Sequence, residues 1–448
     1  NNEIGGDGTI KINGTENQNV TLTTKENIGY KNIVVEKESG DVEINNVAII
    51  ENFENATEGT TIFNAAAIIT NYTNTKGISI LKDISNITTL KNATENAEVK
   101  INAATTFDLI ENAGLVEINE NSTTKSLKNT KKIDIAEGKS LTILENIEDS
   151  GELGGTGALR FTGNAEQSIT LKENAIYPHI VVDKDGGKIT FTNAMTVGLF
   201  ETENSPETVF ENKMIFTDLK IQNGTKNLFK NEVEITSFEI ATASETKFES
   251  NVSVGTFTDK ADSGTYIFNK NASFATETIF NTTETVSFGS DENSTITFES
   301  TDNYVNFTHT AGKTLITGNL SAKDVTLGET SINGTVNAND INCGKTTIAG
   351  NVTANNINDA PILKIIVPTL PNSLNRGTAT SVPSAPPPIL FSPNANASFT
   401  MSDIFWSMLI TPLYISYTLR ITAININNSV YWNIFDDIYP SSSLPSGM

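Results

Sequence analysis

The sequence predicts an all-β chain that is mainly a parallel β-helix, or β-solenoid, with rungs of 16–20 residues and a poorly structured C-terminal tail. Three observations support this fold class: a phrase that recurs at nearly one spacing, short alternating strands, and a strict 16-residue register. A repeat this short cannot bury its own apolar face, so each rung must stack on its neighbours. The main part of the chain is therefore expected to form a rod.

The recurring phrase is an apolar residue followed two positions later by asparagine, with most copies 17 to 20 residues apart. Its copies are Phe53-Glu-Asn55, Tyr72-Thr-Asn74, Leu90-Lys-Asn92, Ile110-Glu-Asn112, Leu127-Lys-Asn129, Leu144-Glu-Asn146, Phe191-Thr-Asn193, Phe210-Glu-Asn212 and Phe229-Lys-Asn231. Asparagine tolerates the left-handed backbone of a sharp corner. Stacked rungs place equivalent side chains about 4.8 Å apart, so asparagine amides can hydrogen-bond along the stack. About 19 rungs over residues 1–360 would form a rod about 90 Å long.

Within the rungs, apolar and polar residues alternate, as in Val99-Lys-Ile101, Val116-Glu-Ile118 and Ile133-Asp-Ile135. A period of two with β-branched residues predicts short strands. No amphipathic helix of useful length is evident before residue 360. Residues 200–300 add a phenylalanine ladder at steps of 19 to 20 residues, formed by Phe210, Phe229, Phe248, Phe268 and Phe288. Each rung is therefore expected to hold two or three strands around an apolar core.

Two further registers divide the rod. Steps of 16 residues relate the segments that begin at Ile316, Ile332 and Ile348. A long repeat relates Gly5-Gly-Asp-Gly8 to Gly154-Gly-Thr-Gly157, and it continues in matching order through Gln18-Asn-Val-Thr-Leu22 and Gln167-Ser-Ile-Thr-Leu171. It then reaches Tyr30-Lys-Asn-Ile-Val-Val35 and Tyr177-Pro-His-Ile-Val-Val182. Two blocks of about 148 residues thus begin in the same way.

These registers divide the chain into five segments: block one of the β-helix at 1–150, block two at 151–314, the end with 16-residue repeats at 315–358, a Pro-rich linker at 359–400, and a C-terminal tail of unknown structure at 401–448. The repeats stop near Asp359, where proline becomes dense. In the tail, the apolar stretch Ile404–Leu419 is broken by Pro412 and is short for a membrane helix.

Composition bounds the function. The formal net charge is −23, which disfavours nucleic acid and anionic lipid as partners. Hydrophobic residues make up 37% of the chain, which suits polar rungs around a thin apolar core better than a large globular core. A single cysteine excludes an internal disulfide framework. The chain begins at Asn1 without an initiator methionine or a signal peptide, so we interpret it as a processed product or a fragment.

Few residues qualify as candidate sites. His179 and His309 are the only histidines, and they lie on rungs several coils apart, so we interpret both as ordinary turn or surface residues. Cys343 aligns with Leu327 in the 16-residue register, which predicts a buried structural thiol rather than a nucleophile. Arg160 is the only arginine of the predicted solenoid. No catalytic, cofactor-binding or metal-binding residue is assigned from the sequence.

Three local motifs have an alternative interpretation. The glycine-rich segments at 5–8 and 154–157 lack the nine-residue period and regular aspartate of calcium β-rolls. Asp183-Lys-Asp-Gly-Gly187 lacks the full ligand series of a calcium loop and is interpreted as a β-turn. Asn-x-Ser/Thr sequons are numerous and would be glycosylated only in a competent compartment. Examples of these sequons are Asn55, Asn71, Asn86, Asn223 and Asn351.

The apolar-x-Asn phrase, the Gly350-Asn-Val-Thr-Ala354 type of repeat and Thr346-Thr-Ile-Ala-Gly350 together resemble bacterial autotransporter passengers, especially rickettsial-type surface cell antigens. The resemblance is one of repeat style and covers about residues 1–358. It implies a β-helical stalk on the bacterial outer membrane that contacts host cells. It also implies a C-terminal translocator barrel, which is expected elsewhere because about 90 residues after the solenoid are too few for one. The Phe-x-x-Asn phrase at Phe248 and Phe268 also resembles chlamydial polymorphic membrane proteins, but their Gly-Gly-Ala-Ile phrase is absent.

We therefore expect a non-enzymatic cell-surface protein, an adhesin or stalk, whose partner is a protein or glycan receptor on a host cell or another surface. No cofactor and no nucleic-acid partner is expected. A polysaccharide-cleaving β-helix enzyme, either a lyase or a hydrolase, is the alternative, because the fold alone does not distinguish the two. Such an enzyme needs carboxylates and a base clustered in a groove. A phage-tail or S-layer component is the third option, and trimerisation would favour the tail.

Overall fold

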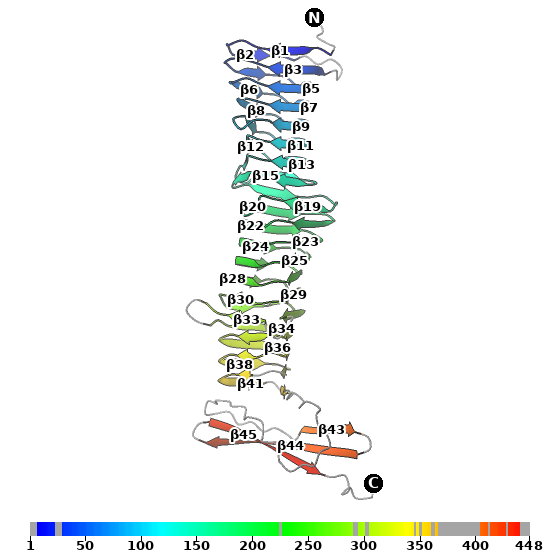
Figure 1. Cartoon of the computed structure of the whole chain (residues 1–448), viewed down its shortest axis with the longest axis vertical. Coiled ribbons are helices and arrows are strands. Elements are labelled where there is room, and N and C mark those ends of the chain that lie inside the picture. The colour runs from blue at the N-terminus through cyan, green and yellow to red at the C-terminus, as the bar shows by residue number, and fades with distance from the viewer. Residues whose placement is uncertain are drawn as a thin grey trace, which may run out of the picture.

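The computed structural model describes residues 7–22, 29–223, 226–289, 294–300, 304–344, 346–348, 352–359, 363–365, 404–410, 413–426 and 429–439. In this part of the chain every regular element is a strand, and all strands but the last three stack as a β-solenoid of about 17 turns (Figure 1). The predicted fold class is confirmed. The turns are fewer than the spacing predicts because some are long; Ile147, for example, pairs with Ile169, 22 positions further on.

Each turn has three faces, which the turn at residues 105–118 illustrates. β11 (Thr105–Asn112) lies on face 1 with residues 105–107 and continues on face 2 with residues 109–112. The short β12 (Leu115–Ile118) forms face 3. Alternate side chains of all three faces point inward and build one continuous hydrophobic core. The alternation read from the sequence is therefore the alternation between core and solvent.

In block one the long strands cover faces 1 and 2, and the short strands cover face 3. The long strands are β3 (Tyr30–Val35), β5 (Ala48–Asn55), β7 (Ala67–Asn74), β9 (Ser85–Asn92), β11 and β13 (Ser122–Asn129). The face 3 strands are β2 (Gln18–Val20), β4 (Val42–Ile44), β6 (Thr60–Phe63), β8 (Ile78–Leu81), β10 (Glu98–Ile101), β12 and β14 (Lys132–Ile135). The first strand, β1 (Thr9–Ile12), pairs with the second half of β3 on face 2.

A buried asparagine ladder runs along the end of face 2 in block one. Each Nδ2 donates to the Oδ1 of the next asparagine at 2.8, 3.2, 3.0 and 2.8 Å, through Asn55, Asn74, Asn92, Asn112 and Asn129. Each also donates to a backbone carbonyl of the following turn. The predicted stacking of asparagine amides is thus confirmed for this block, and it satisfies polar groups that burial would otherwise leave unpaired.

The ladder ends at Asp149. Asn129 Nδ2 donates to Asp149 Oδ1 at 2.8 Å, and the hydroxyl of Tyr177 donates to Asp149 Oδ2 at 2.8 Å. A carboxylate only accepts hydrogen bonds, so it closes a chain of donors that all point in one direction. The sequence predicted that Leu144 and Asn146 continue the ladder, and this prediction is wrong. The turn is three residues longer than the repeat predicts, so Leu127 pairs with Ile147 rather than with Leu144.

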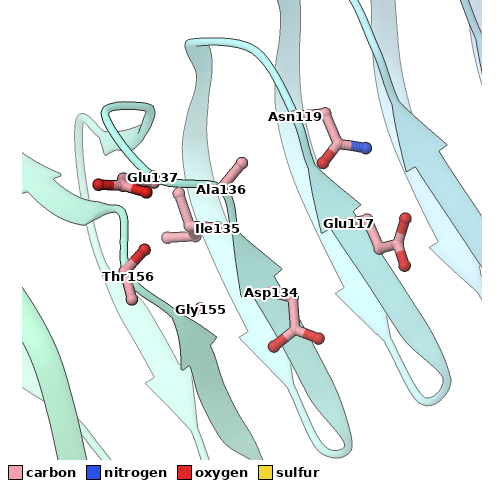
Figure 2. A pocket seen from close by; sticks show the side chains of 8 residues that line it. All are labelled: Glu117, Asn119, Asp134, Ile135, Ala136, Glu137, Gly155 and Thr156. Carbon is pink, nitrogen blue, oxygen red and sulfur yellow. The ribbon is translucent and has the colours of Figure 1, made fainter.

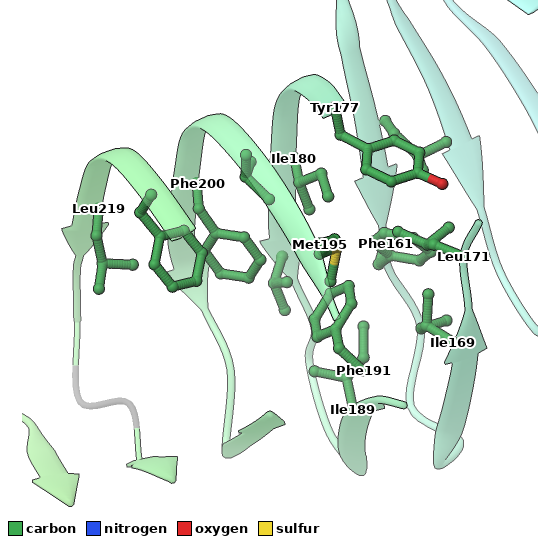
Figure 3. Close-up of a cluster of buried hydrophobic side chains, with 14 of the residues drawn as sticks. Phe161, Ile169, Leu171, Tyr177, Ile180, Ile189, Phe191, Met195, Phe200 and Leu219 are labelled. Atoms are coloured by element: carbon green, nitrogen blue, oxygen red, sulfur yellow. The ribbon is translucent and has the colours of Figure 1, made fainter. Parts of the chain in front are cut away.

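The path of the chain changes at the junction between the blocks. Face 1 continues with β15 (Ser140–Ile143) and β18 (Ala158–Phe161). Face 2 continues with β16 (Ile147–Asp149) and β19 (Gln167–Thr170). The sheet of face 3 that began at β2 ends with β17 (Glu152–Gly155). In block two, the long strands from β20 to β28 begin on face 3 and end on face 1. Figure 3 shows the core of this region, where Phe161, Tyr177 and Phe191 pack together with aliphatic side chains.

Block two therefore has its short strands on face 2. The long strands are β20 (Ile176–Asp183), β22 (Met195–Asn204), β24 (Met214–Ile221), β26 (Val233–Ile240) and β28 (Val252–Asp259). The face 2 strands are β21 (Lys188–Phe191), β23 (Glu207–Phe210), β25 (Lys226–Phe229), β27 (Glu245–Phe248), β29 (Thr265–Phe268) and β32 (Thr285–Phe288). β30 (Ala272–Phe274) and β33 (Thr295–Phe298) lie on face 3, and β31 (Thr278–Ile279) lies on face 1.

The predicted phenylalanine ladder is confirmed as a stack of rings inside face 2 of block two. Neighbouring rings are nearly parallel, with centroids 5.4, 4.5, 4.8, 5.1 and 5.1 Å apart, along Phe191, Phe210, Phe229, Phe248, Phe268 and Phe288. The asparagines that follow the first three rings lie outside the strands, and Asn212 and Asn231 are exposed. The same phrase thus ends in a buried amide in block one and in a solvent-facing bend in block two.

The end of the solenoid confirms the 16-residue register and returns to the first path. β34 (Phe307–Ile316) and β36 (Asp324–Ile332) again run from face 1 to face 2. They are followed by β35 (Asn319–Ser321), β37 (Val336–Asn337), β38 (Asp340–Cys343), β39 (Thr346–Ile348), β40 (Val352–Thr353), β41 (Asn356–Asp359) and β42 (Leu363–Ile365). Because β42 pairs with β39, the solenoid pairing extends into the segment predicted as a linker.

Within the predicted tail, three strands form a separate antiparallel sheet. These are β43 (Ile404–Ile410), β44 (Leu413–Ile426) and β45 (Ser429–Tyr439). The stretch that the sequence showed to be too short for a membrane helix is thus a strand pair.

Candidate functional site

The outer surface of face 3 carries a shallow depression beside the block junction (Figure 2). Its lining comes from β12, β14 and β17 and the bends after them: Glu117, Asn119, Asp134, Ile135, Ala136, Glu137, Gly155 and Thr156. Glu117 and Asp134 are cross-strand neighbours on face 3. Lys100 lies 3.1 Å from Glu117, and Lys132 lies 2.9 Å from Asp134. The depression is therefore lined by stacked carboxylates, and their lysine partners lie beside it. A pair of carboxyl groups is what glycoside hydrolysis uses.

Hydrogen bonds hold these lysines in their charged form. Lys100 donates to Glu98 at 2.6 Å as well as to Glu117, and these two bonds raise the pKa of the Lys100 ammonium. The hydrogen bond to Asp134 raises the pKa of the Lys132 ammonium in the same way. A lysine with a raised pKa stays protonated near neutral pH and is unsuited to act as a general base. Proton abstraction in the depression would have to come from a carboxylate.

A second cluster of charged side chains lies on the outer surface of face 1, at the start of block two. Arg160 contacts Asp183 at 2.7 Å and also contacts Glu203. Glu201 accepts from both His179, at 2.9 Å, and Lys220, at 3.2 Å. Each carboxylate of this cluster thus has a cationic or imidazole partner. Ion pairs of this exposure contribute about 0–1 kcal/mol each, so the cluster balances charge between turns more than it stabilises the fold.

The two histidines have different environments. His179 is half-buried on face 1, next to Glu201, as expected of a surface residue. The interpretation of His309 as a turn or surface residue is wrong, because this residue is fully buried in β34. Its Nε2 donates to the Thr282 carbonyl at 3.1 Å, and its Nδ1 then accepts from the Thr314 hydroxyl at 2.8 Å. Burial lowers the pKa of His309, so the neutral ring fits this site.

A buried lysine that the sequence analysis missed lies within the motif at 183–187. Lys184 is fully buried, and its ammonium donates to the carbonyls of Gly163 and Ala165 at 3.2 and 2.8 Å and to Gln167 Oε1 at 2.9 Å. Burial lowers the pKa of Lys184. The signal was available, because the long repeat continues for two more residues and pairs Lys184 with Lys37. Lys37 is also buried, and it donates to the carbonyl of Glu16 at 2.6 Å.

Asp183 and Gly187, which bound the motif first considered as a calcium loop, have structural roles. Asp183 ends β20 and binds Arg160, and Gly187 adopts a φ of 69° in the bend that follows. The β-turn interpretation is consistent with this bend. Among the described residues there is no group of three or more His, Cys, Asp and Glu side chains placed to hold a metal ion.

The other sequence candidates are distributed along the rod. Cys343 pairs with Leu327 as the 16-residue register predicts, and its side chain lies outside the described part of the structure. Among the sequons, Asn55 is buried in the asparagine ladder and offers no acceptor in the folded protein, whereas Asn71, Asn86 and Asn223 are exposed. Asn351 lies outside the described residues.

The glycine-rich segment at 154–157 has a packing role. A Cβ atom on Gly154 would collide with the Asp134 carboxylate, and one on Gly155 or Gly157 would collide with the carbonyls of Ile135 and Ala136. Gly155 also has a φ of 80°. Close approach of the two blocks, rather than calcium binding, accounts for these glycines.

Comparison of the chain with protein-family models, with curated proteins and with solved structures found no match. In the described part of the chain, no helix has the length and apolar character needed to cross a membrane.

Proposed function

We propose that this chain is a non-enzymatic stalk or adhesin displayed on the bacterial cell surface, of the type of an autotransporter passenger, and that it contacts host cells or other surfaces. One observation carries the proposal. Inward side chains fill a continuous core along about 17 turns, while the described outer faces carry short polar residues and ion pairs between neighbouring turns. Such an architecture holds a binding surface at a distance and needs no enclosed site.

The acidic surface supports the same function. A formal charge of −23 repels the anionic surface of lipid bilayers and nucleic acids and leaves basic or neutral receptors as partners. The repeat style, which resembles passengers of surface cell antigens, points to outer-membrane display. The contacts themselves would lie along the flat faces, where side chains are presented in columns.

The proposal is tested by locating the protein on intact source cells. Antibodies against the solenoid, together with external protease, are expected to reach the protein without permeabilisation of the cells. A cytoplasmic marker protein provides the control for lysis. Protein found only in the cytosol would overturn the assignment.

A glycan-cleaving enzyme is the second candidate, because the depression on face 3 brings Glu117 and Asp134 together beside lysines. Incubation with a panel of acidic and neutral glycans tests it. Cleavage that is lost in a Glu117→Gln, Asp134→Asn variant, and kept in a Glu239→Gln variant altered on face 1, would establish the enzyme in place of the adhesin. A phage-tail component would instead form trimers, which sedimentation detects.

A further inference from the structure

The long repeat is rotated by one face between its two copies. The copy that begins at Gly5 supplies β1, β2 and β3 on face 2, face 3 and then faces 1 and 2. The copy that begins at Gly154 supplies β18, β19 and β20 on face 1, face 2 and then faces 3 and 1. On face 2, seven successive strand pairings lead from β1 to β16, and each pairing corresponds to one full turn of the solenoid. The chain then passes through β17 on face 3 and reaches β18 on face 1 before it returns to face 2. The second copy therefore starts before the eighth turn is complete.

In the second copy, residues that both copies share contact the turn before it. Gln167 is buried, and its Nε2 donates to the carbonyl of Glu145 at 2.7 Å, at the end of block one. Ile169, also buried, pairs with Ile147 of the same preceding turn. Gly157 has no room for a side chain because the Ala136 carbonyl lies against it.

The first copy carries the same groups without such a turn among the described residues. Gln18 donates instead to the carbonyl of Asn13 at 3.1 Å, and its buried Oε1 has no hydrogen-bond partner among the residues that the structure describes. Val20 is only half-buried. A Cβ atom on Gly8, the counterpart of Gly157, would meet nothing within 4 Å. In the structure described, nothing around Gly8 requires a glycine.

We propose that the outer edge of β1 and β2 is a docking surface for the end of a further solenoid block of the block-one type, that is, for a turn like residues 134–149. The internal junction supplies the geometry of this contact. Strand pairing on faces 1, 2 and 3 would bury Gln18 and Val20 and place backbone against Gly8. It would also offer the Gln18 Nε2 a carbonyl acceptor like that of Glu145, which the Gln167 Nε2 uses at the internal junction. Blocks would add end to end, each rotated by one face, to lengthen the stalk.

The test is a chain with one extra block, made of residues 1–153 followed directly by residues 5–448, so that Leu153 precedes Gly5 as it precedes Gly154 in the native chain. If the edge accepts a block end, small-angle scattering gives a single rigid rod about 37 Å longer than the native rod, from seven and two-thirds extra turns at about 4.8 Å each. Two rods joined by a flexible, protease-sensitive link would overturn the proposal.

A substitution at Gly8 separates docking from simple addition of a folded unit. Gly8→Val is expected to leave the melting temperature of the native chain unchanged, because the position is open. In the extended chain it is expected to lower the melting temperature by roughly 5 °C and to make the junction protease-sensitive. The same effects are expected of Gly157→Val in the native chain, because the Ala136 carbonyl lies against Gly157. Equal effects of Gly8→Val in the two chains would contradict the docking surface.

Discussion

Block one and block two fill the same face of the solenoid core with opposite chemistry. At the end of face 2, block one stacks buried asparagine amides, each hydrogen-bonded to the next. Block two stacks buried phenylalanine rings two residues earlier in the same register. We call the asparagine column of block one the amide seam and the phenylalanine column of block two the aromatic seam. Both seams repeat once per turn, so either can extend without limit, but they constrain the stacking of turns in different ways.

The two seams differ in whether their contacts have a donor-to-acceptor direction along the rod. An amide ladder is satisfied only when each donor meets the next acceptor, so a shifted turn would leave buried polar groups unpaired. Ring stacking contributes about 0.5–1.5 kcal/mol per pair beyond burial, and it depends on shape and volume rather than on donor and acceptor order. Block one is therefore held in register by polar specificity, and block two is held by packing. The two seams should fail differently when altered.

The largest effect is expected from a charge in the aromatic seam. Phe229 is fully buried between Phe210 and Phe248, with centroids 4.5 and 4.8 Å away. Phe229→Asp places an unpaired carboxylate there and removes both ring contacts. We expect a loss of about 4 kcal/mol or more, which unfolds block two around the site. Thermal melting followed by circular dichroism measures it.

Phe229→Leu is the matched control for this change. It keeps the apolar character and loses the stacking and part of the volume, so a cost of about 1–2 kcal/mol is expected. If Phe229→Asp melted at the same temperature as the leucine variant, the ring stack would not be the core of block two.

In the amide seam, Asn112→Leu is expected to cost about 3 kcal/mol. The substitution removes the bonds to Asn129 and to the Lys132 carbonyl, and it leaves the Gly114 amide, which donates to Asn112 at 3.0 Å, without a partner. Asn119→Leu is the control, because this asparagine bonds to Asn102 on the exposed surface. A melting temperature lowered equally by the two variants would mean that the buried ladder does not carry the stability of block one.

The two buried lysines compare the blocks at their shared starting motif. Lys184→Met leaves three acceptors unpaired, whereas Lys37→Met leaves one. We expect a cost of about 2 kcal/mol at Lys184 and less than about 1 kcal/mol at Lys37. Chemical denaturation of each variant measures the difference. The reverse order would show that the surroundings of the first copy are tighter than its contacts indicate.

The sequence predicted what depends on periodicity. Strand alternation, the 16-residue register, the phenylalanine stack and the amide ladder all follow from spacing, because a solenoid turns spacing into contact. It did not predict the rotation of block two, since the same phrase of an apolar residue and asparagine occurs on both chain paths. Whether Asn112 is buried and Asn212 exposed depends on where the strand ends, and spacing carries no information about that.

The sites were predicted less well for a related reason. His309 and Lys184 are polar residues in inward positions, and polarity alone assigns them to the surface. Their burial depends on acceptors supplied by other turns, such as the Thr282 carbonyl and Gln167. The charged clusters around Arg160 and Glu117 likewise arise across strands from residues about 20 positions apart, which no local motif displays.

The smallest effect is expected from a change of pH. It also distinguishes the two blocks, because the buried His309 lies in β34, outside block one. Burial lowers the pKa of His309 below the ordinary value of 6.5. The unfolded chain therefore binds the proton first as the pH falls through 6.5, and stability declines from there down to the lowered pKa. Melting temperatures measured between pH 8 and pH 5 should show this decline for the turns around β34 and not for block one. In a His309→Leu variant, which carries the residue found at Leu327 one turn later, the decline should disappear.

Asp259 lies nearby, and burial raises its pKa above the ordinary value of 3.8. Its effect on stability is therefore opposite to that of His309, because the folded chain binds this proton first as the pH falls. An Asp259→Asn background isolates the contribution of the histidine. An unchanged pH profile in the leucine variant would mean that the proton binds elsewhere.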